Sequence, residues 1–116
     1  MKVLVCGGRN FNDMEAVLNA LDTLHRGDPI TEIAHGGAKG ADKLSGVWAH
    51  ANRIPCRIYP ANWGRDGNAA GPIRNVFMLK DFTPDLVVAF PGGKGTAHMV
   101  KIARKAGRKV IEVEIV

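Results

Sequence analysis

An unbroken apolar run followed at once by a glycine-rich turn is the feature that most restricts how this chain can fold. Residues 86–90 read Leu-Val-Val-Ala-Phe, and residues 91–96 read Pro-Gly-Gly-Lys-Gly-Thr. A strand that is apolar at every position is typical of a parallel sheet covered on both faces. Thr96 is the expected N-cap of a helix over residues 97–106. The segment predicts a helix N-terminus that binds an anion, with a tight turn that holds no ligand as the alternative.

The same succession of strand, turn and helix recurs along the chain. Strands are expected at residues 2–6, 30–35, 55–59, 86–90 and 109–116, with helices that end near residues 25, 52, 81 and 106. This alternation predicts an α/β fold with a five-stranded parallel sheet and helices on both faces. A length of 116 residues suits one domain. We therefore expect a single Rossmann-like, doubly wound domain over residues 1–116.

Glycine turns follow three of the expected strands. If the strand order is three-two-one-four-five, these turns meet at one edge of the sheet, at the topological switch point where ligands bind. The residues expected to contact phosphate or the rest of the ligand are Gly7, Gly8, Arg9, Gly36, Gly37, Lys39, Gly40, Arg74, Asn75, Pro91, Gly92, Gly93, Lys94, Gly95 and Thr96.

Residues 60–71 interrupt the pattern. They contain three Gly, two Asn and one Pro and show no hydrophobic period. A long polar loop in so small a domain is usually functional or mobile. We expect an irregular loop here, followed by a helix that begins at Gly71-Pro72, where proline fits the first turn.

Several kinds of site are disfavoured by what the sequence lacks. Neither a Gly-x-Gly-x-x-Gly fingerprint nor a Gly-Lys-Ser/Thr phosphate loop is present, which argues against nicotinamide cofactors and ATP hydrolysis. The four histidines have no metal-ligand spacing, so no metal and no cofactor are expected, although His35 and His98 fall near the glycine turns. Cys6 and Cys56 are expected to be free, buried thiols.

The charge is unevenly distributed. The net charge is +5, and Lys101, Arg104, Lys105 and Arg108 recur at helical spacing, so that they share one outer face. A solvated helix face explains them, and a patch for nucleic acid is the alternative. Two Trp and one Tyr offer few rings for base stacking, which weakens that alternative.

No stretch of the sequence is suited to a membrane or to secretion. The longest apolar runs are far shorter than a membrane span, and the N-terminus lacks a signal-peptide pattern. We expect a cytoplasmic protein with no membrane partner.

Three motifs in this order resemble a known superfamily. They are Gly-Gly-Ala-Lys-Gly-Ala-Asp at 36–42, Ala-Gly-Pro-Ile-Arg-Asn at 70–75, and the turn at 91–96. Together they resemble the SLOG group of Rossmann-like domains, most closely its YspA/YpsA-related branch. More distant similarity is to the Lonely Guy phosphoribohydrolases and to DNA-processing protein A. The resemblance spans the chain and implies nucleotide binding at the glycine edge, a bacterial or phage source and a possible homodimer.

The resemblance also implies which residues would be catalytic. In the phosphoribohydrolases an arginine and a glutamate serve cleavage of the N-glycosidic bond. Arg74 occupies the arginine position, but Met99 stands where the glutamate is expected. Methionine can neither stabilise a cationic sugar nor activate water. Asp42 is the remaining candidate carboxylate, and it either points into the pocket or caps its own helix.

The sequence thus favours one function and leaves others open. The favoured function is a binding module for a nucleotide or a phosphorylated ribose derivative, with poor N-glycosidase activity or none. One alternative is a phosphoribohydrolase that uses Arg74 with a relocated carboxylate at Asp42. The other is a module that binds single-stranded DNA.

Overall fold

A five-stranded parallel sheet forms the centre of the protein. The computed structural model describes residues 1–115, and the strand order is β3-β2-β1-β4-β5. The elements, in chain order, are β1 (Lys2–Cys6), α1 (Met14–Gly27), β2 (Glu32–His35), α2 (Ala41–Ala51), β3 (Cys56–Ile58), α3 (Trp63–Asp66), the 3-10 helix η1 (Gly67–Ala69), α4 (Ala70–Phe82), β4 (Leu86–Ala89), α5 (Lys94–Lys105) and β5 (Lys109–Glu112). The expected α/β fold, parallel sheet and strand order are confirmed.

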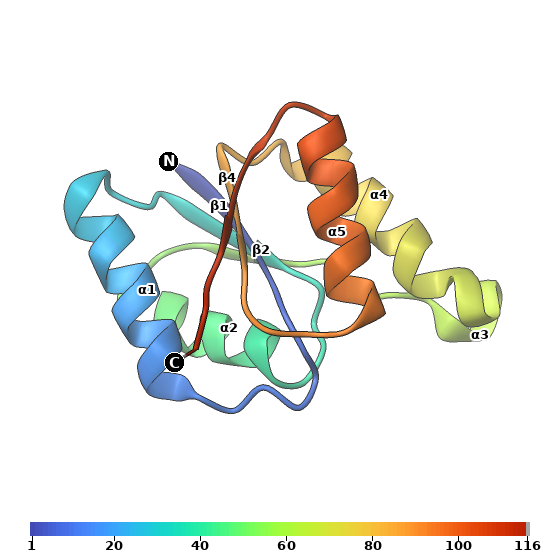
Figure 1. The fold of residues 1–116 in the computed structure, drawn as a ribbon, viewed down its shortest axis with the longest axis horizontal. Coiled ribbons are helices and arrows are strands. Elements are labelled where there is room, and N and C mark those ends of the chain that lie inside the picture. Colours follow the sequence, from blue (N-terminus) through green and yellow to red (C-terminus); the bar gives the residue numbers. More distant parts are fainter. Residues whose placement is uncertain (116) are drawn as a thin grey trace.

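Helices cover both faces of the sheet (Figure 1). Side chains alternate between the faces along each strand, so Val3 and Val5 pack in the core with α1 and α2. Leu4 and Cys6 point the other way, into the core with α4 and α5. The central strand β1 is therefore buried on both sides, as is usual for a parallel sheet covered by helices.

The connections place the switch point beside β1. Val3 pairs with Ile33 of β2 on one side and with Leu86 of β4 on the other. The chain therefore leaves β1 toward one face and β4 toward the opposite face, and the turns after these strands lie next to each other.

The start of the last helix differs from the prediction. α5 begins at Lys94 with Gly93 as its N-cap, so Thr96 lies in the first turn and is not the N-cap. The backbone explains the difference: Gly93 is non-helical (φ −99°, ψ −141°) and its carbonyl accepts the first helical hydrogen bond, from the Ala97 N–H at 3.1 Å. The glycine-rich turn thus extends into the helix itself.

The prediction of an irregular loop at residues 60–71 is wrong, because most of this segment is helical. The Asn62 side chain caps α3 by accepting a hydrogen bond from the Arg65 N–H at 3.0 Å. Gly67 ends α3 with a positive φ of 57°, and η1 leads directly into α4 at Ala70. Helices of one turn carry no hydrophobic period, so periodicity alone could not reveal them.

Three smaller predictions also need correction. Cys6 is buried as expected, but Cys56 is exposed because β3 is an edge strand. Arg108 does not share the basic face of α5: it lies beyond the helix end, and its guanidinium donates to the Pro84 carbonyl. β5 ends at Glu112, and residue 116 of the predicted strand lies outside the described residues.

Candidate functional site

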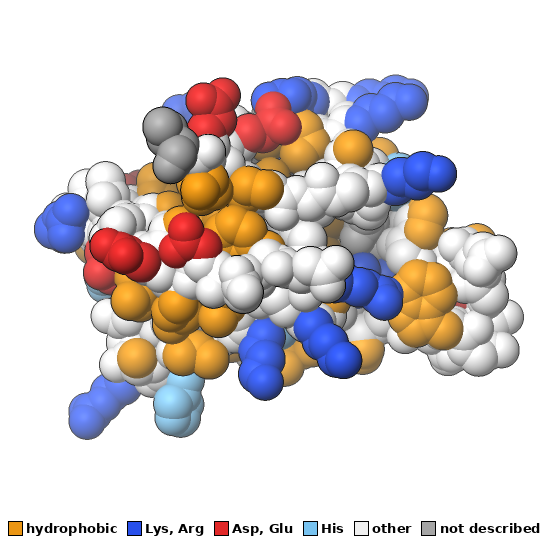
Figure 2. All heavy atoms as spheres, turned by 60° about the horizontal axis from the view of Figure 1, so that its bottom comes forward, with side chains coloured by type: hydrophobic (Ala, Val, Ile, Leu, Met, Phe, Trp, Pro, Cys, Tyr) orange, Lys and Arg blue, Asp and Glu red, His pale blue; other side chains and the backbone are white. Residues whose placement is uncertain are grey.

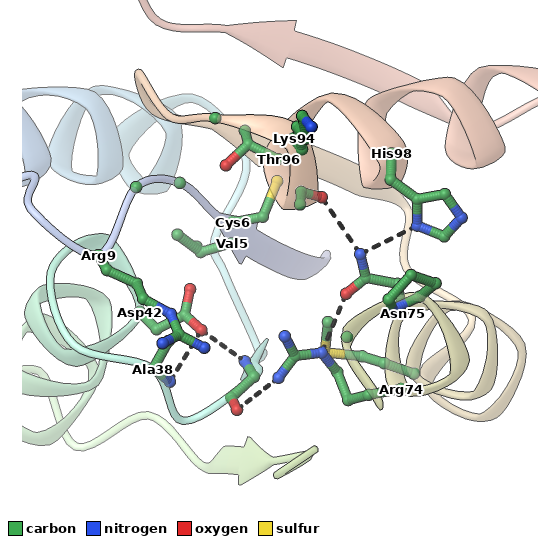
Figure 3. A pocket seen from close by; sticks show the side chains of 18 of the residues that line it. Val5, Cys6, Arg9, Ala38, Asp42, Arg74, Asn75, Lys94, Thr96 and His98 are labelled. Carbon is green, nitrogen blue, oxygen red and sulfur yellow. Dashed lines mark hydrogen bonds between the residues drawn. The ribbon is translucent and has the colours of Figure 1, made fainter. Parts of the chain in front are cut away.

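A cleft of about 620 Å³ opens at the C-terminal ends of β1 and β4 (Figure 3). Its walls come from every glycine turn and from the start of α4. The lining residues are Val5, Cys6, Gly7, Gly8, Arg9, Gly36, Ala38, Asp42, Trp63, Asn68, Gly71, Pro72, Arg74, Asn75, Met78, Gly93, Lys94, Gly95, Thr96 and His98. This volume matches that of small-molecule sites.

The N-terminus of α5 forms one wall of the cleft. The N–H groups in the first turn of any helix have no intrahelical partner. In α5 no side chain caps them either. Lys94, Gly95 and Thr96 are in that turn and line the cleft. A Cβ at Gly93 or Gly95 would meet nothing within 4 Å. The backbone here is open to an incoming group, and the helix dipole favours an anion.

The turn after β1 is packed tightly between its neighbours. The Gly8 N–H donates to the Pro91 carbonyl at 2.9 Å, and the Gly8 carbonyl accepts from the Ala41 N–H at 3.2 Å. A Cβ at Gly8 would stand 2.9 Å from the Pro91 oxygen. Gly8 therefore ties the turn after β4 to the start of α2, and its missing side chain is what lets the turns meet.

Asp42 holds the turn after β2. One carboxylate oxygen, Oδ2, accepts hydrogen bonds from the N–H groups of Gly36 at 3.0 Å and Ala38 at 3.1 Å (Figure 3). The side chain lines the cleft and does not cap its own helix, whose N-cap is Gly40. Burial raises the pKa of Asp42 above its ordinary value, although these hydrogen bonds and Arg74 act in the opposite direction.

Arg74 contacts the same turn from its carbonyl side. Its Nη1 donates to the Gly36 carbonyl at 2.7 Å and to the Tyr59 carbonyl at 3.2 Å. Its Nε donates to Asn75 Oδ1 at 2.9 Å. The guanidinium fork is therefore already engaged, and Nη2 is the nitrogen left to meet a ligand. Burial lowers the pKa of Arg74, but a guanidinium remains charged at neutral pH.

Asn75 connects Arg74 to the first turn of α5. Its Nδ2 donates to the Gly95 carbonyl at 3.2 Å and lies 3.2 Å from His98 Nδ1 (Figure 3). Because Oδ1 accepts from Arg74 and Nδ2 donates to Gly95, the amide orientation is fixed. An amide nitrogen only donates, so His98 Nδ1 is the acceptor in this contact.

The structure brings most of the predicted residues together. Gly7, Gly8, Arg9, Gly36, Asp42, Arg74, Asn75, Gly93, Lys94, Gly95, Thr96 and also His98 line the cleft. Gly37 and Lys39 instead line an adjacent pocket of about 470 Å³, which Arg9 and Arg74 share. Gly40, Pro91 and Gly92 line neither pocket. His35 is buried away from the cleft, where its Nδ1 accepts from the Gly37 N–H.

Two sulfur-bearing residues, Met99 and Cys6, are unsuited to chemistry at this cleft. Met99 is fully buried between α5 and the sheet and does not line the cleft. Cys6 lines the cleft floor, but burial, with the nearby Asp42 carboxylate, raises its pKa to about 12. A thiol with that pKa is protonated at neutral pH and is a poor nucleophile.

Sequence reasoning missed eight lining residues, and four of them, Trp63, Asn68, Gly71 and Pro72, come from one stretch of the chain. All four belong to the segment interpreted as a loop or to the start of the next helix. A tryptophan in a polar, aperiodic stretch was the available signal, since such a ring has no core to join. The Arg9 guanidinium lies next to Trp63, with its Cζ 5.3 Å from the ring centroid.

Residues 1–115 hold neither a candidate membrane span nor a candidate metal cluster. No helix in this range is long and apolar enough to cross a membrane. Within the same range, His, Cys, Asp and Glu side chains form no group of three that could hold a metal ion.

Comparison with known proteins identifies the family. Gene 61 protein of Mycobacterium phage D29 is 37% identical over 118 residues, which cover 95% of this chain and 94% of the phage protein. MurG of Acinetobacter baumannii has a similar fold, with a TM-score of 0.58 at 15% identity over 96% of this chain, which spans 34% of that longer protein. Residues 1–65 match the family described as the YspA, cpYpsA-related SLOG family. The chain therefore belongs to the YspA, cpYpsA-related SLOG family.

Proposed function

We propose that the cleft binds a nucleotide or a phosphorylated ribose derivative, with phosphate at the N-terminus of α5. The observation that carries this proposal is the uncapped first turn of α5, where Gly93 and Gly95 leave the backbone open. Packing does not require a glycine at either position, and neither has a positive φ. Phosphate is the anion that such a turn accommodates best.

The charges around the cleft support an anionic ligand. Arg9, Arg74 and Lys94 line it, and Asp42 is the carboxylate among the lining residues. Among residues 1–115, neither Arg9 nor Lys94 has an ion pair within 4.0 Å. Figure 2 shows Lys and Arg side chains around a hollow on this side of the molecule, with the visible Asp and Glu side chains gathered elsewhere. An incoming phosphate therefore meets unpaired positive charge.

Lys94 offers the test with a matched control. Lys94 and Lys101 are both exposed lysines of α5, but Lys101 does not line the cleft. We expect Lys94→Gln to weaken binding of nucleoside monophosphates and ribose 5-phosphate by about three- to tenfold, as for a charge-assisted hydrogen bond of about 1 kcal/mol. Lys101→Gln should leave it unchanged. Isothermal titration calorimetry measures both. Failure of every phosphorylated compound to bind would refute the proposal.

A second candidate, N-glycoside cleavage, is favoured by one observation at Asp42. Its Oδ2 is engaged by two N–H groups, whereas the contacts within residues 1–115 leave Oδ1 unbonded in a side chain that lines the cleft. The activity expected is slow, because Asp42 is held by the turn and position 99 supplies no acid. A missing general acid or base typically costs about a hundredfold or more.

Release of free base from nucleoside monophosphates measures this activity. Any release should be lost in Asp42→Asn while ligand binding persists. Brisk release that survives Asp42→Asn but not Arg74→Ala would place the catalytic acid elsewhere.

A further inference from the structure

The segment at the mouth of the cleft contains a tryptophan with no structural partner in the core. Trp63 begins α3 and is 49% exposed, whereas Trp48, the other tryptophan, is fully buried. Neither core cluster includes Trp63. An indole left half in water gains little for folding, so its position calls for another explanation.

Local interactions hold Trp63 in place. Asn62 caps α3, and the Arg65 guanidinium makes a two-pronged pair with the Asp66 carboxylate, with both nitrogen–oxygen distances at 2.9 Å. A Cβ on Gly71 would lie 3.6 Å from the indole edge, at ordinary van der Waals distance, so the start of α4 lies beside the ring. The short helix and the start of α4 thus set the ring at the cleft mouth.

Arg9 adds a second planar group beside this ring. Its Cζ lies over the indole, 5.3 Å from the ring centroid, and Arg9 has no ion pair among residues 1–115. Both side chains line the cleft and also the adjacent pocket that Lys39 borders. Aromatic rings and arginine planes are the two groups on which nucleobases stack.

We infer that Trp63 and Arg9 form a base-binding subsite, so that the ligand class is a nucleotide with an intact base. This inference rests on the proposed phosphate binding at α5. The base contacts the indole and the guanidinium at the mouth, the ribose spans the cleft, and the phosphate reaches the first turn of α5. A sugar phosphate without a base fills only the inner part of the cleft.

The test compares adenosine 5′-monophosphate with ribose 5-phosphate by calorimetry and tryptophan fluorescence. We expect the nucleotide to bind about tenfold more tightly, at the lower range of base–aromatic stacking, and to quench emission. Trp63→Ala should remove that advantage and leave ribose 5-phosphate binding unchanged, which shows that the inner cleft is intact. Trp63→Phe should retain most of the affinity while the quenching disappears. The matched control is Phe77→Ala, an exposed ring on α4 that does not line the cleft.

The outcomes separate this inference from the proposed function. Equal binding of both compounds, unchanged in Trp63→Ala, would overturn the base subsite while phosphate binding stands. Equal loss of both compounds in Trp63→Ala, with an unchanged melting temperature, would also overturn it, because the ring would then serve the whole cleft. Absence of binding by either compound would refute the proposed function and this inference with it.

Discussion

The glycines in the turns after the strands are of two kinds, those that packing requires and those that packing does not require. In the turns after β1 and β2, a Cβ at Gly7, Gly36 or Gly40 would overlap a neighbouring residue: the Ala41 side chain, the Arg74 guanidinium or the Gly8 carbonyl. In the turn after β4, a Cβ at Gly92 would also overlap its neighbours, the Thr96 side chain and the Gly8 amide, but a Cβ at Gly93 or Gly95 would meet nothing. The first kind is required by packing between turns, and the second leaves space that the protein itself does not fill. A glycine-rich sequence alone does not distinguish the two.

Replacing a glycine of the first kind should produce the largest effect. Gly40 has φ +76°, and a Cβ there would overlap the Gly8 carbonyl oxygen. We expect Gly40→Ala to lower the free energy of unfolding by about 3 kcal/mol or more, because strain and overlap add. Urea denaturation followed by circular dichroism measures it. A loss below about 1 kcal/mol would show that the turns can separate without cost.

Substitutions at Asp42 test whether the turn after β2 depends on the Asp42 carboxylate. Asp42→Ala leaves the Gly36 and Ala38 N–H groups without their acceptor, and we expect a loss of about 2 kcal/mol in the free energy of unfolding. Asp42→Asn is the matched control, since its amide oxygen can accept both hydrogen bonds. Equal losses in the two variants would mean that charge, and not hydrogen bonding, holds the turn.

Gly95→Ala tests a glycine of the second kind, which packing does not require. Alanine has the higher helix propensity and a Cβ meets nothing, so the free energy of unfolding should rise by up to about 1 kcal/mol. Binding of phosphorylated ligands should fall about tenfold, which corresponds to about 1.4 kcal/mol. Gly27→Ala is the control, because a Cβ at the end of α1 also meets nothing. It should change the free energy of unfolding without changing ligand binding. If Gly95→Ala lowers the free energy of unfolding, Gly95 belongs to the first kind of glycine, which packing requires.

The smallest effect concerns pH. Burial raises the folded-state pKa of Asp42 above its unfolded value near 3.8, so the folded protein keeps this proton to higher pH. The stability gained from protonation is complete below 3.8 and is lost as the pH rises through the folded pKa. Wild type should therefore lose stability relative to Asp42→Asn over that interval, which thermal melts at a series of pH values detect. A difference in melting temperature between wild type and Asp42→Asn that does not change with pH would contradict this prediction.

Periodicity and glycine placement were sufficient to predict the fold. Continuous apolar runs such as residues 86–90 predicted buried parallel strands, and the turns predicted which edge would hold the cleft. The N-terminus of α5 was misplaced because Gly93 and not Thr96 supplies the non-helical residue. α3 was missed because a one-turn helix depends on a cap and an ion pair, which propensity does not register.

The site was predicted less completely than the fold. The sequence placed Arg74 among the residues that contact the ligand, but the Gly36 and Tyr59 carbonyls occupy its Nη1. Likewise, the two roles left open for Asp42 did not include holding the turn before its helix. Contacts between residues this far apart in sequence depend on how the turns pack, and local pattern does not encode that.

The position of Gly8 has a consequence for how the two faces of the sheet communicate. Its amide and its carbonyl bridge the turn before α5, on one face, to the first residue of α2, on the other. We expect a ligand on the first turn of α5 to stabilise this turn and, through it, both hydrogen bonds of Gly8. The expected signature is slower deuterium exchange at the Gly8 and Ala41 amides, even though Ala41 lies across the sheet from the bound group.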